Sequence, residues 1–186
     1  MAGLYILGQL QNIRSVPDLL GWLARRQMEY EGGYSGRSNK LVDGCYSFWI
    51  GGSSALMILN GSATSENKIG SFMHDAALER YLLLCGQCVE GGLRDKPSKN
   101  RDFYHTCYCL SGLSTAQHYG HTKSSGLSLE DTAIYGHPSN LVQKTDPAVN
   151  IRVERVEQIY CFFQEKNIIM SENGFCNYHG VLMKAT

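Results

Sequence analysis

Hydrophobic residues recur along much of this chain every three or four positions, the spacing that places them on one face of an α-helix. Leu78, Tyr81, Leu82 and Cys85, for example, occupy the i, i+3, i+4 and i+7 positions of such a face. We find no convincing alternation of the kind that marks a half-buried strand. The pattern therefore predicts an all-α protein with helices at about residues 15–30, 45–59, 71–88, 103–119 and 149–163, and a loop over residues 120–148.

The chain also contains an internal repeat. In each copy a Gly-Gly pair follows one predicted helix, a basic loop comes next, and an aspartate precedes the following helix. The matching positions lie 59 residues apart: Gly32 and Gly91, Gly33 and Gly92, Arg37 and Lys96, Lys40 and Lys99, Asp43 and Asp102. Repeated helical hairpins stack into a solenoid or a closed ring, in which equivalent positions of neighbouring units lie side by side.

This register predicts a metal site between the two units. Asp43 and Cys45 stand at the start of one predicted helix, and His105 stands at the start of the next. Gly44 relaxes the backbone between the first two residues, so that a carboxylate and a thiolate can face one ion. One carboxylate, one thiolate and one imidazole are ligands that zinc accepts, and a fourth position would stay open for a substrate.

The loops before both helices are basic and have aromatic residues close by in sequence. Their cations are Arg37, Lys40, Lys96, Lys99 and Arg101. Cations close to helix N-termini favour an anion. The aromatic residues Tyr34, Tyr46, Trp49, Phe103, Tyr104 and Tyr108 are candidates for the wall of an apolar cavity. A metal, an anion site and an apolar wall together indicate an apolar diphosphate donor, and Asp95 is placed to hold magnesium against that diphosphate.

Composition narrows the class of protein further. The 17 Lys and Arg residues balance the 17 Asp and Glu residues, which argues against a broad nucleic-acid-binding surface. No run approaches the roughly 20 apolar residues of a membrane span, and the first residues do not resemble a signal peptide. The seven cysteines are then most simply reduced thiols, as in a cytoplasmic protein.

Two long stretches, residues 31–49 and 91–114, closely resemble the β subunits of protein farnesyltransferases. The resemblance runs from about residue 3 to residue 163 and implies an α–α barrel (toroid), here an incomplete ring of helical hairpins. It assigns residues 1–166 to a partial prenyltransferase domain and leaves residues 167–186 as an unmatched tail. It covers only the second half of the family's chain, so we do not expect residues 1–186 to be active alone.

The resemblance also implies an activity, which is the zinc-dependent transfer of a farnesyl group from farnesyl diphosphate to a cysteine near the C-terminus of a target protein. The implied partners are a farnesyltransferase α subunit and these two substrates. The implied zinc and catalytic residues are Asp43, Cys45 and His105, with Tyr46 as a further catalytic residue. The implied substrate-binding residues are Arg37, Lys40, Tyr46, Trp49, Tyr104, Lys96 and Lys99, and Asp95 would bind magnesium.

Two other interpretations stay open at this point. The first is a catalytically inactive truncated fragment that retains at most zinc binding or α-subunit binding. The second is a small structural-zinc module built from Cys85, Cys88, Cys107 and Cys109, although these thiols are more simply explained by packing. Metal stoichiometry after Cys45→Ser and after Cys85→Ser would separate the second interpretation from the others.

Overall fold

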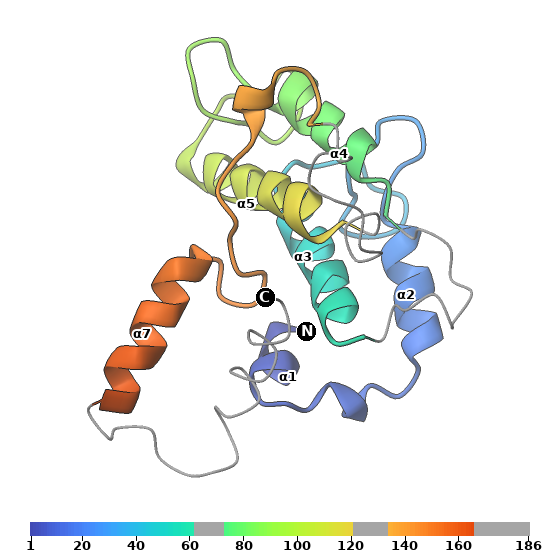
Figure 1. The fold of residues 1–186 in the computed structure, drawn as a ribbon. Coiled ribbons are helices and arrows are strands. Elements are labelled where there is room, and N and C mark those ends of the chain that lie inside the picture. Colours follow the sequence, from blue (N-terminus) through green and yellow to red (C-terminus); the bar gives the residue numbers. More distant parts are fainter. Residues whose placement is uncertain (62–72, 121–133, 166–186) are drawn as a thin grey trace.

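The computed structural model describes residues 1–61, 73–120 and 134–165. Its helices are α1 (Ala2–Ile6), α2 (Val16–Ala24), α3 (Tyr46–Leu59), α4 (Asp75–Tyr81), α5 (Phe103–Tyr119) and α7 (Val153–Glu165) (Figure 1). Short 3-10 segments occupy Leu10–Asn12 and Pro138–Asn140, and a π-helical segment, Leu82–Gly86, continues α4. Within the described ranges β-structure is limited to three isolated bridges, so the predicted all-α class is confirmed.

The helix starts follow from local capping. The Ser15 hydroxyl accepts the amide hydrogen of Asp18 at the start of α2. Asp102 caps α5 in the same way, because one of its carboxylate oxygens accepts from the amide of His105 at 2.7 Å. The bounds of α3 and α5 agree with the predicted helices at residues 45–59 and 103–119.

Three predicted helices differ from the structure. The helix predicted for residues 15–30 ends at Ala24, because the chain turns back on itself over residues 27–34. The helix predicted for residues 71–88 begins at Asp75 and changes from α to π after Tyr81; residues 71 and 72 lie outside the described ranges. The last helix begins at Val153 rather than Val149, because residues 145–152 form another turn. The short helix α1 was not predicted.

Three turns of the same kind follow one another along the chain. Each is closed by an antiparallel bridge: Gln27 with Tyr34, Gln87 with Leu93, and Thr145 with Arg152. The third turn lies 118 residues after the first, which is twice the 59-residue repeat. Asn150 has a positive φ of 56° at the place where Gly32 has 83°, because asparagine also tolerates the left-handed region. The chain thus carries a third turn that the Gly-Gly pattern did not reveal.

The two inner helices, α3 and α5, cross at the centre of the molecule (Figure 1). Helices α1 and α2 pack against α3, and α4 packs against α5. The core between them is built from apolar side chains such as Leu20, Leu23, Ile50, Met57, Leu78, Leu82 and Leu113. Glycine at position 112 permits this crossing, since a Cβ there would lie 2.3 Å from the Ser47 Cβ. The beginning of α3, directly after the first loop, is consequently held against the middle of α5.

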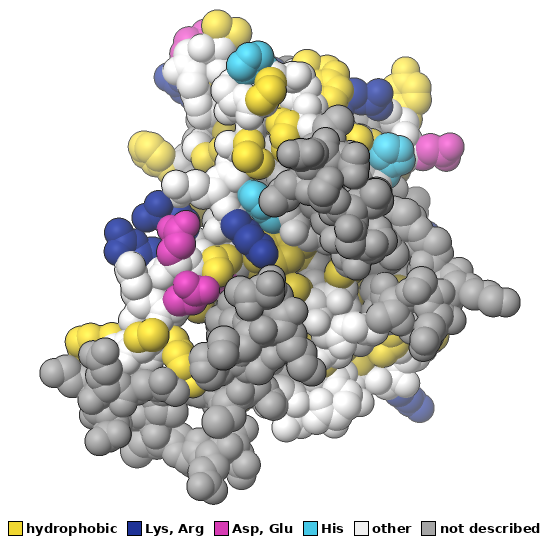
Figure 2. Space-filling model, in the orientation of Figure 1, with side chains coloured by type: hydrophobic (Ala, Val, Ile, Leu, Met, Phe, Trp, Pro, Cys, Tyr) yellow, Lys and Arg dark blue, Asp and Glu magenta, His cyan; other side chains and the backbone are white. Residues whose placement is uncertain are grey.

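Helix α7 extends from the third turn away from the α3–α5 pair (Figure 1). Figure 2 shows hydrophobic side chains on its surface, and Ile159, Phe162 and Phe163 are 47%, 53% and 41% exposed. Shallow hollows along this helix are lined by its own residues, including Gln158 and Phe162. They lie on a different element from the predicted site residues.

Candidate metal centre

Three side chains from two successive units meet between the beginnings of α3 and α5. Asp43, Cys45 and His105 each offer a ligand atom, and these atoms lie within 4.8 Å of one another. His105 Nε2 is 3.3 Å from Asp43 Oδ1. Among residues 1–61, 73–120 and 134–165, this is the one group of three or more His, Cys, Asp or Glu side chains with such spacing.

The backbone around Gly44 places the first two of these ligands. Asp43 Oδ1 accepts the amide hydrogen of Cys45 at 2.9 Å, which folds the carboxylate over the start of α3. The Gly44 amide donates to the backbone oxygen of Asp95 at 2.7 Å. A Cβ at position 44 would lie 2.5 Å from Cys109 Sγ and 2.9 Å from the Arg94 oxygen. Only glycine therefore allows the two ligands to approach the second loop this closely.

His105 is oriented by Asp102, one helical turn earlier. Asp102 Oδ2 lies 2.7 Å from His105 Nδ1, and Asp102 Oδ1 accepts from the His105 amide. With the hydrogen of the imidazole on Nδ1, the Nε2 lone pair faces Asp43, as a metal ligand requires. The hydrogen bond from the His105 amide is also the main cause that lowers the pKa of the Asp102 carboxyl group. Asp102 therefore remains an acceptor at neutral pH.

The donor set fits zinc. Burial raises the pKa of the Cys45 thiol to about 12, and Asp43 adds to this shift while a hydrogen bond with Tyr104 opposes it. A divalent cation reverses this balance, since it binds the thiolate and releases the proton. Carboxylate, thiolate and imidazole would supply three ligands to zinc and leave a position for a further ligand.

An aromatic wall lies beside these ligands. The Trp49 indole donates to the Tyr104 hydroxyl at 3.1 Å, and the Tyr108 ring lies 4.5 Å from Trp49 and 4.8 Å from Tyr104, centroid to centroid. Trp49 and Tyr104 are 42% and 49% exposed, so the wall faces outward. Two other aromatic candidates do not belong to it. Tyr34 is buried in the core, and the Phe103 side chain is 97% exposed.

A family model for the prenyltransferase α–α toroid domain matches residues 1–151. The chain belongs to this family. The chain is 43% identical to a fission yeast (Schizosaccharomyces pombe) protein named protein farnesyltransferase subunit beta, over 144 residues that cover 76% of this chain and 37% of the relative. Proteins with the same name in Saccharomyces cerevisiae and Pisum sativum are 41% and 33% identical, over 87% and 89% of this chain. The chain spans between 36% and 52% of the length of these three relatives.

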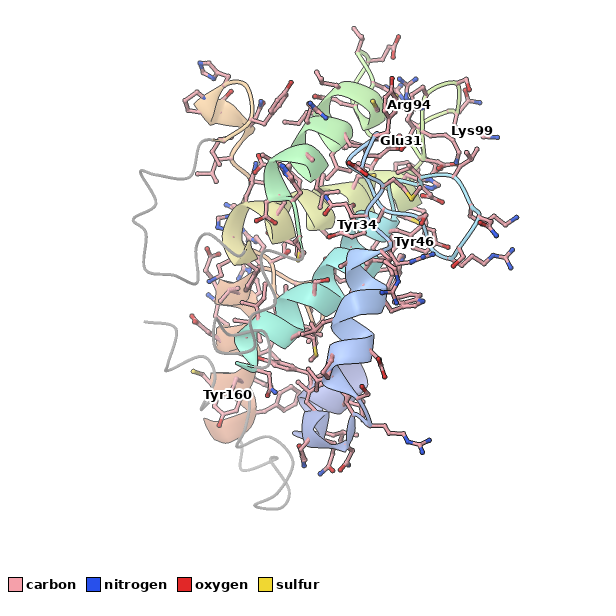
Figure 3. All side chains as sticks on the ribbon, turned by 90° about the vertical axis from the view of Figure 1, so that its right-hand side faces the viewer. Glu31, Tyr34, Tyr46, Arg94, Lys99 and Tyr160 are labelled. Carbon is pink, nitrogen blue, oxygen red and sulfur yellow. The ribbon has the colours of Figure 1, made fainter. Side chains whose placement is uncertain are left out.

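The two basic loops of this toroid chain lie next to each other, joined by the bond from Gly44 to Asp95. Arg37, Lys40 and Lys99 are exposed. The Tyr46 ring lies over Gly36 of the first loop, where an added Cβ would be 2.0 Å from the Tyr46 Cζ. Figure 3 shows Tyr46 and Lys99 on the side of the molecule where these loops lie.

Two other cations of the loops have partners of their own. Lys96 Nζ contacts both carboxylate oxygens of Asp95, so the predicted magnesium ligand forms an ion pair in this structure. The Arg101 guanidinium donates to the backbone oxygens of Glu90 and Gly91. Arg101 therefore closes the second turn and is removed from the candidate anion site.

The structure does not gather the four thiols of the alternative zinc module. Cys109 is fully buried, and its Sγ contacts the Arg94 oxygen at 3.8 Å. Cys107 is exposed and accepts from the Asn150 amide group at 3.7 Å. They do not form a metal-ligand group among the residues that the structure describes, so this interpretation is wrong.

Sequence reasoning missed one polar member of the centre. Asp102, which orients His105, was noticed only as the repeat partner of Asp43. Its spacing of three residues before His105 is the available signal, because an aspartate at a helix start can cap the amide three positions later.

Proposed function

We propose that this chain is the portion of a protein farnesyltransferase β subunit that holds zinc and transfers a farnesyl group from farnesyl diphosphate to a cysteine thiol near the C-terminus of a protein. The observation that carries this proposal is the convergence of Asp43, Cys45 and His105 beside the aromatic wall of Trp49 and Tyr104. The names of the three relatives, each a protein farnesyltransferase subunit beta, support it.

The reaction requires one bond to form and one to break. The cysteine sulfur bonds to the first carbon of the farnesyl group, the thiol proton is lost, and diphosphate leaves with the electron pair of the broken carbon–oxygen bond. Asp43, Cys45 and His105 would hold zinc, whose Lewis-acid chemistry would lower the pKa of a substrate thiol. Trp49 and Tyr104 would pack against the isoprenoid and the peptide and exclude water.

Charge on the departing diphosphate needs donors on the same side of the site. Arg37 and Lys40 are exposed on the first loop, and Tyr46 lies against that loop, so we assign these three residues to the diphosphate. Lys99 is exposed on the second loop and extends the same basic surface. These donors would stabilise the negative charge that develops on the diphosphate in the transition state more than they stabilise the bound substrate. This difference accelerates the reaction.

Asp95 is the proposed magnesium ligand, but in this structure its carboxylate is already paired with Lys96. Magnesium and the Lys96 ammonium group would compete for the same carboxylate oxygens. A bound diphosphate offers Lys96 another anion and releases Asp95 for the cation. We therefore propose that magnesium binds at Asp95 together with the diphosphate rather than before it.

The remaining assignments complete the proposal. We assign residues 1–166 to the partial toroid domain and residues 167–186 to a tail outside it, a boundary beyond the described ranges. The proposed partners are a farnesyltransferase α subunit, with which the chain would form a heterodimer, and cysteine-ending protein substrates, in the cytoplasm. Within residues 1–61, 73–120 and 134–165, no helix combines the length and the apolar character needed to cross a bilayer.

The decisive experiment grafts this chain onto a complete relative. The segment of the fission yeast β subunit that matches this chain is replaced by the corresponding residues of the chain, and the chimera is expressed with its α subunit. We expect zinc-dependent transfer of a farnesyl group to a cysteine-ending peptide, and loss of that transfer after Cys45→Ser. A chimera that transfers farnesyl equally well with and without Cys45 would refute the proposed function.

The alternative of an inactive fragment is tested on residues 1–186 themselves. The chain is purified alone and with the α subunit, and zinc content, α-subunit binding and farnesyl transfer are measured. An active chimera together with an inactive chain that still binds zinc would assign the chemistry to these residues and the complete activity to the longer protein. Turnover by the chain alone would contradict our expectation that residues 1–186 require further partners.

A further inference from the structure

Tyr81 occupies a position between the two units that the proposed metal centre does not explain. It is the last residue of α4 and is only 4% exposed. Its ring packs against Gly33 of the first turn, where an added Cβ would lie 2.7 Å from the ring. Its hydroxyl donates to the backbone oxygen of Asp95, in the second loop, at 3.0 Å. One side chain therefore contacts both units.

The oxygen that Tyr81 contacts is shared with the metal centre. The same Asp95 oxygen accepts the Gly44 amide hydrogen at 2.7 Å, and Gly44 lies between the two ligands Asp43 and Cys45. The backbone segment that carries two of the three ligands is thus fixed to the second loop through one carbonyl group. Tyr81, at the end of α4, donates a second hydrogen bond to the same carbonyl oxygen.

The second loop is in turn fixed to the helix that carries the third ligand. The Leu93 amide donates to the Thr106 hydroxyl at 2.9 Å, and the Arg94 oxygen contacts Cys109 Sγ. Thr106 and Cys109 belong to α5, as His105 does. The Asp95 carbonyl is therefore one of the contacts that set the separation between Asp43 and Cys45 on one side and His105 on the other, beside the direct packing of Ser47 against Gly112.

We propose that Tyr81 is a positioning residue for the metal centre, whose hydroxyl fixes the Asp95 carbonyl and thereby the spacing of the ligands from the two units. This inference rests on the proposed metal centre and adds a residue that contacts no ligand atom itself. Burial raises the pKa of Tyr81, so its hydroxyl stays a donor throughout the physiological pH range. A metal centre tolerates little error in ligand spacing, so loss of this hydrogen bond should weaken metal binding.

Tyr119 provides a matched control. Its hydroxyl also donates to a backbone oxygen at 3.0 Å, that of Thr145, and the residue is 7% exposed. Replacing either tyrosine by phenylalanine removes one buried hydrogen bond and keeps the ring. The two variants should therefore lose similar stability, while only Tyr81→Phe alters the metal centre.

The test titrates Co²⁺ and Zn²⁺ into the wild-type chain, Tyr81→Phe, Tyr119→Phe and Cys45→Ser, each with its α subunit where that is needed for solubility. Co²⁺ reports the thiolate ligand by its charge-transfer absorption. We expect Tyr81→Phe to bind both ions about threefold to tenfold more weakly, the range that one hydrogen bond supports, and to shift the cobalt spectrum. Tyr119→Phe should match the wild-type affinity and spectrum.

The outcomes distinguish failure of the positioning role of Tyr81 from failure of the proposed metal centre. Wild-type affinity and an unchanged spectrum in Tyr81→Phe would overturn the positioning role and leave the metal centre intact. Equal weakening in Tyr119→Phe would also overturn it, since the effect would then follow from stability alone. Failure of the wild-type protein to bind either ion, or full binding by Cys45→Ser, would refute the metal centre and this inference with it.

A second measurement needs no variant and covers the case in which Tyr81→Phe does not fold. In wild-type protein with isotope-labelled tyrosine, zinc addition should shift the Tyr81 ring resonances and slow hydrogen exchange at the Gly44 amide. The Tyr119 resonances should not move. Tyr81 resonances and Gly44 exchange that are indifferent to zinc would contradict the proposal.

Discussion

Replacing Gly112 by alanine should force the two inner helices apart. The new Cβ would lie 2.0 Å from the Ser47 hydroxyl oxygen and 2.7 Å from the Ser47 carbonyl carbon, whereas ordinary contacts begin at 3.4 Å. The hydroxyl can rotate away, but the Ser47 Cβ, 2.3 Å from the new Cβ, and the carbonyl carbon are both fixed by the backbone at the start of α3. Helices α3 and α5 must therefore separate by about 1.1 Å, the difference between an ordinary contact of 3.4 Å and the 2.3 Å at the Ser47 Cβ, or distort locally, which is overpacking of the core.

The expected loss follows from opposing contributions. Overpacking costs about 1–3 kcal/mol, and disturbing the buried Ser47 hydroxyl, which donates to the Gly44 oxygen, costs on the order of 1 kcal/mol more. The better helix propensity of alanine offsets about 1 kcal/mol. We expect a net loss of about 1–3 kcal/mol in the free energy of unfolding. In a chain of this size that lowers Tm by roughly 2–12 °C.

Gly52→Ala is the control for Gly112→Ala. Gly52 lies in the interior of α3, and a Cβ there would be 3.5 Å from the Phe48 ring and 3.6 Å from the Pro147 oxygen, which are ordinary contacts. This substitution should raise Tm slightly, since it gains up to about 1 kcal/mol of helix propensity. Circular dichroism during heating measures both variants, and zinc affinity should fall only in Gly112→Ala. An unchanged or raised Tm in Gly112→Ala would show that the close crossing of the inner helices has been misjudged.

Three further predictions concern the site and its loops. Cys45→Ser should lose bound zinc while Cys85→Ser keeps it, as measured by metal analysis after dialysis, and equal retention would exclude Cys45 as a ligand. Asp95→Ala, in the chimera with the fission yeast β subunit, should raise the magnesium concentration required for transfer several-fold without weakening peptide binding; an unchanged magnesium dependence would leave Asp95 only its ion pair. Ser98→Asn should raise Tm by a few degrees, because Ser98 has a φ of 69° and asparagine, present at the equivalent Asn39, tolerates that conformation better. A fall in Tm would mean that the serine side chain compensates for its backbone.

The two turns that contain a glycine pair were predicted from the sequence, whereas the third turn, in which Asn150 takes the place of the first glycine, was not. Gly32 and Gly91 have φ values of 83° and 85°, and this requirement is visible as a glycine in each unit. Asn150 meets the same requirement without a glycine, so the sequence pattern predicts loop and helix where the third turn lies. The change from α to π after Tyr81 was also invisible, since the side chains keep an apolar periodicity close to that of an α-helix.

The part of the site that follows from residue type and from the 59-residue repeat could be predicted from the sequence. Asp43, Cys45 and His105 could be brought together from the 59-residue offset and the helix starts, and the structure places their ligand atoms within 4.8 Å. The bonds of the Asp95 carbonyl could not be predicted, because every residue has a carbonyl group and only the folded backbone decides which donors reach it. Tyr34 and Tyr104 look alike as nearby aromatic residues, and only burial separates a core residue from a wall residue.

The ligands of the proposed metal centre come from two successive units, and this arrangement has a thermodynamic consequence. In a repeat protein the stability is approximately a sum over units and over the interfaces between neighbours, as in a one-dimensional chain of coupled elements. An ion held by Asp43 and Cys45 from one unit and His105 from the next strengthens one of these couplings and no other. With metal, the first two units should melt as a single cooperative block. After chelation that block should separate into two transitions, with the third turn at residues 145–152 following neither of them closely.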